Sequence, residues 1–265
     1  MFCLIHVSSV FSQAAKERGN ISITVGAAMP VGQFASTALL DSKSGFAKTG
    51  ESLSLSYSRP IAKTTSLIVH IQAQRNPINK NAFENSFSQL KIYQGFYAGS
   101  GQNNPPPQTS YKIYPGWKFE KKSWLYRALL LGAQKQFKPN SYDKINLFAK
   151  IMAGAMYAQS PELNGKSFSD TATANFQQSK SSAFGFVYSF GGGFNYTLTK
   201  TVFLTSALAY FGSNKIVFKD VKTTFTTTKG TFGSPEYSVQ QSATTGNGKQ
   251  AISSVNVAAG IGFKL

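Results

Sequence analysis

Much of the chain alternates between apolar and polar positions with a period of two, the pattern of a β-strand whose two faces differ. Residues 52–58 are the plainest case, because Leu53, Leu55 and Tyr57 alternate with four serines. Residues 202–212 are mixed in pattern but rich in β-forming side chains. The predicted strands are residues 20–29, 52–58, 66–74, 124–137, 144–157, 184–198, 202–212 and 254–265.

The segment 124–137 fits a strand in either of two phases. We favour the phase that places Leu129, Leu131, Ala133 and Phe137 on the apolar face, with glycine and glutamine opposite. In the closing segment, every second residue from Val255 to Leu265 is apolar, and the residues between them are small or polar. These strands therefore each have one apolar face.

Strand length and link length together indicate a membrane barrel. Most of these segments reach ten residues, close to the roughly 9–11 of a transmembrane strand and longer than the usual 5–6. Short and long links alternate, as in outer-membrane barrels. The short links are 60–64, 139–142 and 199–201, and the long ones are 31–49, 75–123, 159–181 and 217–249. The sequence predicts an all-β fold: an eight-stranded antiparallel transmembrane β-barrel with short periplasmic turns and long extracellular loops.

The faces of such a barrel follow from its surroundings. Lipid cannot satisfy exposed backbone groups, so a spanning sheet must close on itself. Eight strands leave an interior just wide enough for side chains. We therefore expect the apolar set to face lipid and the Ser, Gly, Asn and Lys set to fill the lumen. A soluble β-barrel or sandwich is the alternative, and it would bury the apolar set instead.

The amino-acid composition excludes several other classes of protein. Among 265 residues, 22 Phe and 12 Tyr exclude a disordered chain, and a single cysteine, Cys3, excludes a disulfide scaffold. No apolar run approaches the roughly 20 residues of a membrane helix. Charged residues make up 14%, below the usual quarter or so.

The net charge of +17 raises the question of which anionic partners the protein binds. The lysines are dispersed without a basic stripe, so no nucleic-acid partner is predicted. The four long links hold 14 lysines and one arginine against 7 carboxylates. Such an excess would attract the phosphates of outer-membrane lipids and lipopolysaccharide. A simply solvated loop surface is the alternative.

The first residues have the character of a targeting segment. MFCLIHVSSVFSQ is a short apolar run that ends in small residues, as in the apolar and cleavage regions of a secretory signal peptide, although the positive start is missing. We expect residues 1–15 to be a cleaved signal peptide and residues 16–265 to form the barrel domain. A buried first strand is the alternative interpretation.

Three stretches carry a resemblance to a known family: ITVGAAMPVGQF, FNYTLTKTVFLTSALAYFG and VNVAAGIGFKL. With them, residues 18–265 resemble the small OmpA/OmpX-type outer-membrane β-barrel proteins of Gram-negative bacteria. The resemblance implies an outer-membrane location and the barrel-assembly machinery as a partner. Gly260, Phe263 and Leu265 have the spacing of the C-terminal assembly signal, with leucine in place of the usual terminal aromatic. The family is functionally diverse, so the fold implies little about activity.

Catalytic chemistry has little support in the sequence. His70 is the only imidazole after the expected cleavage, and no neighbouring pattern supplies a nucleophile. One histidine with scattered carboxylates makes no metal site, and no cofactor is predicted. The run 191–193 lies inside an aromatic strand, so its glycines relieve crowding and do not form a phosphate loop. The alternatives are a lipid-modifying enzyme that uses His70, or a narrow pore that Lys144, Phe148 and Lys150 would obstruct.

The second long link is the most distinctive. An amphipathic piece over 81–93 precedes three consecutive prolines, which enforce an extended segment. Aromatic side chains around the prolines suit either recognition or packing of the loop onto itself. The fourth link is rich in Thr over 219–249, and this part is expected to extend the two flanking strands as a ribbon above the membrane. The candidate partner-binding residues are Tyr97, Pro105, Pro106, Pro107, Tyr111, Tyr114 and Trp117. The predicted function is non-enzymatic, either structural or a surface interaction with an extracellular ligand or protein.

Overall fold

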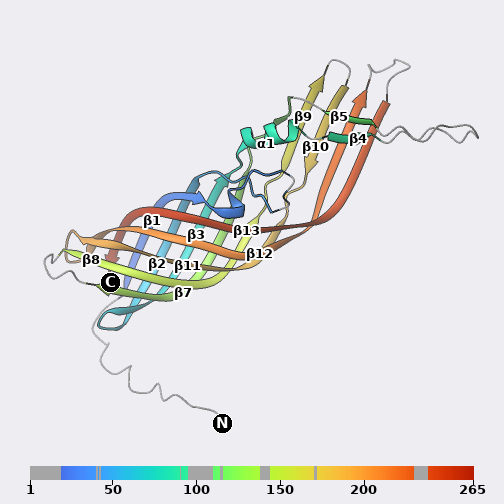
Figure 1. Cartoon of the computed structure of the whole chain (residues 1–265). Helices are drawn as coiled ribbons and strands as arrows, with labels where there is room; N and C mark the ends of the chain where they lie inside the picture. Colours follow the sequence, from blue (N-terminus) through green and yellow to red (C-terminus); the bar gives the residue numbers. More distant parts are fainter. Residues whose placement is uncertain are drawn as a thin grey trace, which may run out of the picture.

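Eight long strands of the computed structural model close into an antiparallel ring (Figure 1). The structure describes residues 19–39, 41, 43–89, 91–94, 110–113, 116–137, 144–169, 172–229 and 238–265, so the expected signal peptide lies outside it. The order around the ring is β11-β8-β7-β3-β2-β1-β13-β12, and pairing of β11 with β12 closes it. The ring strands are β1 (Asn20–Pro30), β2 (Gly50–Ala62), β3 (Thr65–Pro77), β7 (Ser123–Phe137), β8 (Ile145–Gln159), β11 (Ser182–Thr197), β12 (Val202–Lys229) and β13 (Ser238–Lys264).

All eight predicted strands and the alternation of short and long links are confirmed. Short links join β2 to β3, β7 to β8 and β11 to β12. The expected ribbon in the fourth link is also confirmed. Strands β12 and β13 are 28 and 27 residues long and remain paired far beyond the ring. Among the described residues, no helix has the length and apolar character needed to cross a membrane.

The outer wall of the barrel is apolar. On β7, Leu129 and Leu131 are exposed while Leu130 between them is fully buried, which confirms the favoured phase. Ile151 on β8 and Phe190 on β11 are likewise exposed, by 67% and 52%. A surface of this kind is stable only against lipid, and the closed ring leaves no open sheet edge there. The barrel therefore has the architecture of bacterial outer-membrane proteins.

The lumen is packed, and it is less polar than the alternation predicts. Ser, Asn, Gln and His side chains from β1, β2 and β3 fill one side. On the other side, Leu130, Met152, Met156 and Val187 are buried. Large side chains lie opposite small ones, as Met152 does opposite Gly132. Eight strands enclose too little space for a water-filled channel, so the lumen is packed like a core.

Beyond the ring, the long links build a second structure that we call the head (Figure 1). It comprises β12 and β13 beyond Gly212 and Ser253 together with β6 (Lys118–Phe119), β9 (Leu163–Ser169), β10 (Ala172–Gln178) and helix α1 (Lys80–Ser88). Strands β10, β9 and β6 add successively to the free edge of β12. The C-terminus lies at the opposite end of the barrel (Figure 1).

Smaller elements complete the links. A 3-10 turn, η1 (Gly32–Phe34), follows β1, and β4 (Lys91–Gln94) pairs with β5 (Ser110–Ile113). The amphipathic piece predicted over 81–93 is helical only in its first part, because α1 ends at Ser88. Asn79 caps this helix by accepting a hydrogen bond from the backbone of Ala82, which satisfies one free N–H of the first turn.

Candidate functional site

A serine and the only described histidine meet inside the lumen. Strands β2 and β3 place Ser56 directly opposite His70, and Ser56 Oγ lies 2.7 Å from His70 Nδ1. His70 is 5% exposed and faces inward with Gln72 and Gln74, as its phase predicts. Sequence reasoning found no nucleophile for this histidine, because Ser56 is 14 residues away and only the strand register brings the two together.

Among the described residues that surround this pair, there is no carboxylate to complete a hydrolytic site. It lines a cavity of about 70 Å³, room for only a handful of water molecules. The charged group that shares the cavity with His70 is Lys150, and none of the described side chains that line it is a carboxylate. An imidazole that acts as a general base is normally oriented by such a group. The contact is therefore best described as a hydrogen bond that satisfies two lumen groups.

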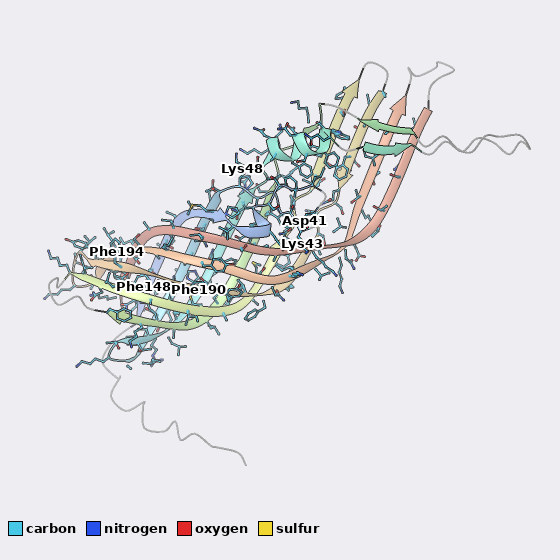
Figure 2. All side chains as sticks on the ribbon, in the orientation of Figure 1. Asp41, Lys43, Lys48, Phe148, Phe190 and Phe194 are labelled. Atoms are coloured by element: carbon cyan, nitrogen blue, oxygen red, sulfur yellow. The ribbon has the colours of Figure 1, made fainter. Side chains whose placement is uncertain are left out.

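Above this cavity, an amide ladder closes the lumen. Gln72 donates to Gln74 at 2.8 Å, and Gln74 donates to Asn76 at the same distance. Asn76 in turn donates to the backbone carbonyls of Ala28 and Lys48, which ties the ladder to β1 and to the first long link. Nearer the turns, Phe148 points inward and is 7% exposed. Figure 2 places Phe148 within the barrel. Side chains thus obstruct the route that a pore would need.

The run 191–193 lies within β11, as predicted. Gly193 lies opposite Phe148 of β8, and a Cβ at Gly193 would approach the tip of that ring to 2.8 Å. This glycine therefore makes room for a bulky lumen side chain, which is one of the uses expected for glycines in barrel strands.

An aromatic core holds the head together. The ring of Phe87 on α1 lies 5.1 Å from Trp117, 5.0 Å from Phe119 and 4.8 Å from Phe176 of β10. Glu84 of the same helix accepts a hydrogen bond from the backbone N–H of Phe119 at 2.7 Å. Links that are far apart in the sequence thereby become one packed unit, with a geometry that isolated loops would lack.

The candidate partner-binding residues do not share one environment in the structure. Trp117 is only 1% exposed, so it cannot present its ring to a partner. It packs within the head, as the alternative interpretation of the loop proposed, because its ring stacks on Phe119. Tyr111 belongs to β5. Tyr97, Tyr114 and the three prolines, Pro105 to Pro107, lie outside the described residues.

At the base of the head there is a cavity of about 280 Å³. Its wall combines side chains from all four long links, and Phe46, Phe83 and Phe218 are among them. The rim is polar, with Asp41 and Lys249 exposed. Figure 2 shows Asp41 and Lys43 next to each other near this base. Sequence reasoning missed the cavity, because no local pattern indicates that four separate links meet.

Charged groups on the head are largely unpaired. The described part of the chain holds two ion pairs, Lys80–Glu84 at 3.6 Å and Lys122–Glu120 at 2.9 Å. The hydrogen bond from Lys122 is the main reason that the pKa of the Glu120 carboxyl is lowered. Within the same residues there is no group of three or more His, Cys, Asp or Glu side chains placed to hold a metal ion.

The predicted assembly-signal residues lie at the end of β13. Gly260 lies opposite Thr24, and a Cβ at Gly260 would collide with the carbonyl oxygen of Ile23. Phe263 faces outward and is 47% exposed, and the backbone N–H of Leu265 donates to Gly19. These positions show how the strand closes against β1, and their role in assembly stays a prediction.

No family model matches the chain, and no curated protein matches its sequence. Among solved structures, it is similar to Ail, the attachment invasion locus protein of Yersinia pestis, with 12% identity over 93% of this chain and 99% of that one (TM-score 0.37). Neisserial surface protein A has 11% identity over 93% and 96% (TM-score 0.40). OprG of Pseudomonas aeruginosa has 10% over 94% and 96% (TM-score 0.40). The strand pairing described above defines the barrel independently of these likenesses.

Proposed function

We propose that the protein is a non-enzymatic outer-membrane barrel that binds an extracellular ligand or protein through its head. The observation that carries this proposal is that the long links form a packed structure beyond the ring. A barrel needs only short connections to span the membrane, so paired strands and an aromatic core outside it serve another purpose.

The head suits recognition because it is pre-organised. Strands β12 and β13 pair from Lys229–Ser238 down to the ring, and β10 and β9 widen this ribbon into a sheet. A rigid platform loses less conformational entropy on binding than mobile loops do. In the sequence, the segment 95–109, which holds three consecutive prolines, connects β4 to β5.

The lumen supports the non-enzymatic part of the proposal. The Ser56–His70 contact is enclosed, lies beside Lys150 and lacks an orienting carboxylate among the described residues. Phe148 and the ladder from Gln72 to Asn76 obstruct the route that a substrate would take through the lumen. Binding at the head therefore agrees better with the geometry than catalysis or transport through the barrel.

Excision of Gly99–Gln108 tests the proposal. The deletion removes the proline segment and leaves every described strand intact, so the barrel should still show its heat-dependent gel shift. Cells that carry the excised protein should bind host-cell or matrix surfaces less than cells that carry the full chain.

A matched control removes residues 231–236 of the fourth link, which in the sequence lie between β12 and β13. If excision of Gly99–Gln108 leaves surface binding at the level of the full chain, as the control deletion should, recognition by the proline segment is wrong. If both abolish the gel shift, the loops are needed for folding, and the separation between barrel and head is wrong.

A further inference from the structure

Two arginines lie on the lipid-facing wall, where a charged side chain is unexpected. Arg75 on β3 and Arg127 on β7 are both exposed and both occupy the outward phase of their strands. Arg127 lies between Leu125 and Leu129 in that phase, and both of these leucines are exposed apolar positions. A cation at the centre of this wall would be costly, and one near the interface is tolerated.

Strand register places the two arginines next to each other. Ala73 pairs with Arg127 and Arg75 pairs with Leu125, so the arginines are diagonal neighbours on adjacent strands. Diagonal positions are about 7–8 Å apart, within reach of long side chains. The small side chain of Ala73 lies between Arg127 and Leu53 in the same transverse row.

The arginines border a depression on the outer wall. Its volume is about 910 Å³, and Val25, Leu53 and Leu125 supply apolar walls. Tyr157 pairs with Arg127 across β7 and β8 and is 40% exposed, so its hydroxyl provides a further polar group. Glu51 also lines the depression and pairs with Arg75 across the register.

Among the described residues, neither arginine forms an ion pair, although the carboxylate of Glu51 lines the same depression. The ion pairs found there involve other residues, so Glu51 forms none with Arg75. Arg75 Nε donates to Ser123 Oγ at 3.2 Å, which leaves its other guanidinium N–H groups available. Two adjacent guanidinium groups match the geometry of a phosphate, which accepts paired hydrogen bonds from arginine.

The level of this site in the membrane indicates the kind of anion. Glu51 is the second residue of β2, and Gln159, which pairs with Leu125, is the last of β8. The depression thus lies where the ring meets the long links. The next transverse row toward the turns is wholly apolar: it consists of Ile23, Leu55, Ile71, Leu129 and Ala155.

We propose that Arg75 and Arg127 bind the phosphorylated headgroup of an outer-leaflet lipid whose acyl chains pack against the apolar row below. The inference rests on the membrane orientation of the proposed function, with the head outside. A lipid fits better than a free phosphate, because the polar groups lie at the membrane surface while the adjoining wall is apolar.

The test measures binding of lipid A to the purified, delipidated full chain in detergent by native mass spectrometry, with phosphatidylcholine for comparison. Arg127→Gln and Arg75→Gln should each weaken binding of lipid A about tenfold, the loss expected for one charge-assisted hydrogen-bonding partner. Lys135→Gln is the matched control, because Lys135 is exposed on the same outward face of β7 near the opposite end of the strand.

Equal weakening by Lys135→Gln would overturn the proposal, since general positive charge would then explain the binding. Binding of phosphatidylcholine as tight as that of lipid A would also overturn it. Binding of inorganic phosphate as tight as that of lipid A, with the same dependence on Arg127, would assign the site to free phosphate and reject the lipid. Excision of Gly99–Gln108 should leave lipid A binding unchanged, so this test and that of the head fail separately.

Discussion

Replacement of Ile151 by arginine tests the assignment of the barrel faces most directly. Ile151 faces outward from β8 and is 67% exposed. At a rise of about 3.4 Å per residue and a tilt of about 40°, each residue advances about 2.6 Å across the membrane. Ile151 then lies about 10 Å from the level of Leu147 and about 16 Å from that of Tyr157, near the midplane.

The expected cost follows from this depth. Arginine on the lipid face costs about 2–4 kcal/mol at the midplane and about 0–1 near the interfaces. Ile151→Arg should therefore lower the folding equilibrium constant by roughly 30- to 900-fold. Ile261→Arg should cost less, because Ile261 is close to the end of β13.

The assay is urea unfolding of the protein in phosphatidylcholine vesicles, followed by tryptophan fluorescence and by the gel shift. Ile151→Leu serves as the control, since it keeps an apolar side chain of the same size. If Ile151→Arg and Ile151→Leu had the same unfolding midpoint, Ile151 would not face lipid. The phase of β8, and with it the membrane barrel, would then be wrong.

Four further outcomes are expected. Gly262→Ser should destabilise the barrel by about 1–3 kcal/mol in the same urea assay, because a Cβ at Gly262 collides with the buried ring of Phe203. The control is Ala258→Ser, which should be nearly neutral because Ala258 lines the polar lumen cavity. Phe87→Ala should open the aromatic core of the head, so limited proteolysis should cut the head while the gel shift of the barrel persists. Deletion of Phe263–Leu265 should prevent insertion and leave the protein in the periplasm, and normal amounts of heat-modifiable barrel would disprove the assembly signal. By mass spectrometry, lipid A should have the same acyl pattern in cells without the protein, with the protein and with His70→Ala. An acyl pattern that changes when the protein is present and returns to the original with His70→Ala would establish the lipid-modifying alternative.

Most of the ring strands were predictable because each has a clear local pattern. Leu53, Leu55 and Tyr57 alternate with serines whatever their neighbours are, and a period of two already separates a lipid face from a lumen face. Link lengths then indicated the direction of the barrel. Even the extension of β12 and β13 could be anticipated, since a Thr-rich segment between two strands favours continued pairing.

The sites were not predictable in the same way, because they depend on register and on contacts between distant links. Ser56 meets His70, Phe203 meets Gly262, and Arg75 lies beside Arg127 only through pairing across strands. A shift of one residue would turn each of these side chains to the other face. Trp117 looked like a contact residue because its sequence is that of an exposed loop, yet Phe87 and Phe119 bury it. Local alternation determined the wall of the barrel, and only tertiary packing decided which side chains meet, because the free energy of those contacts comes from residues far apart in the chain.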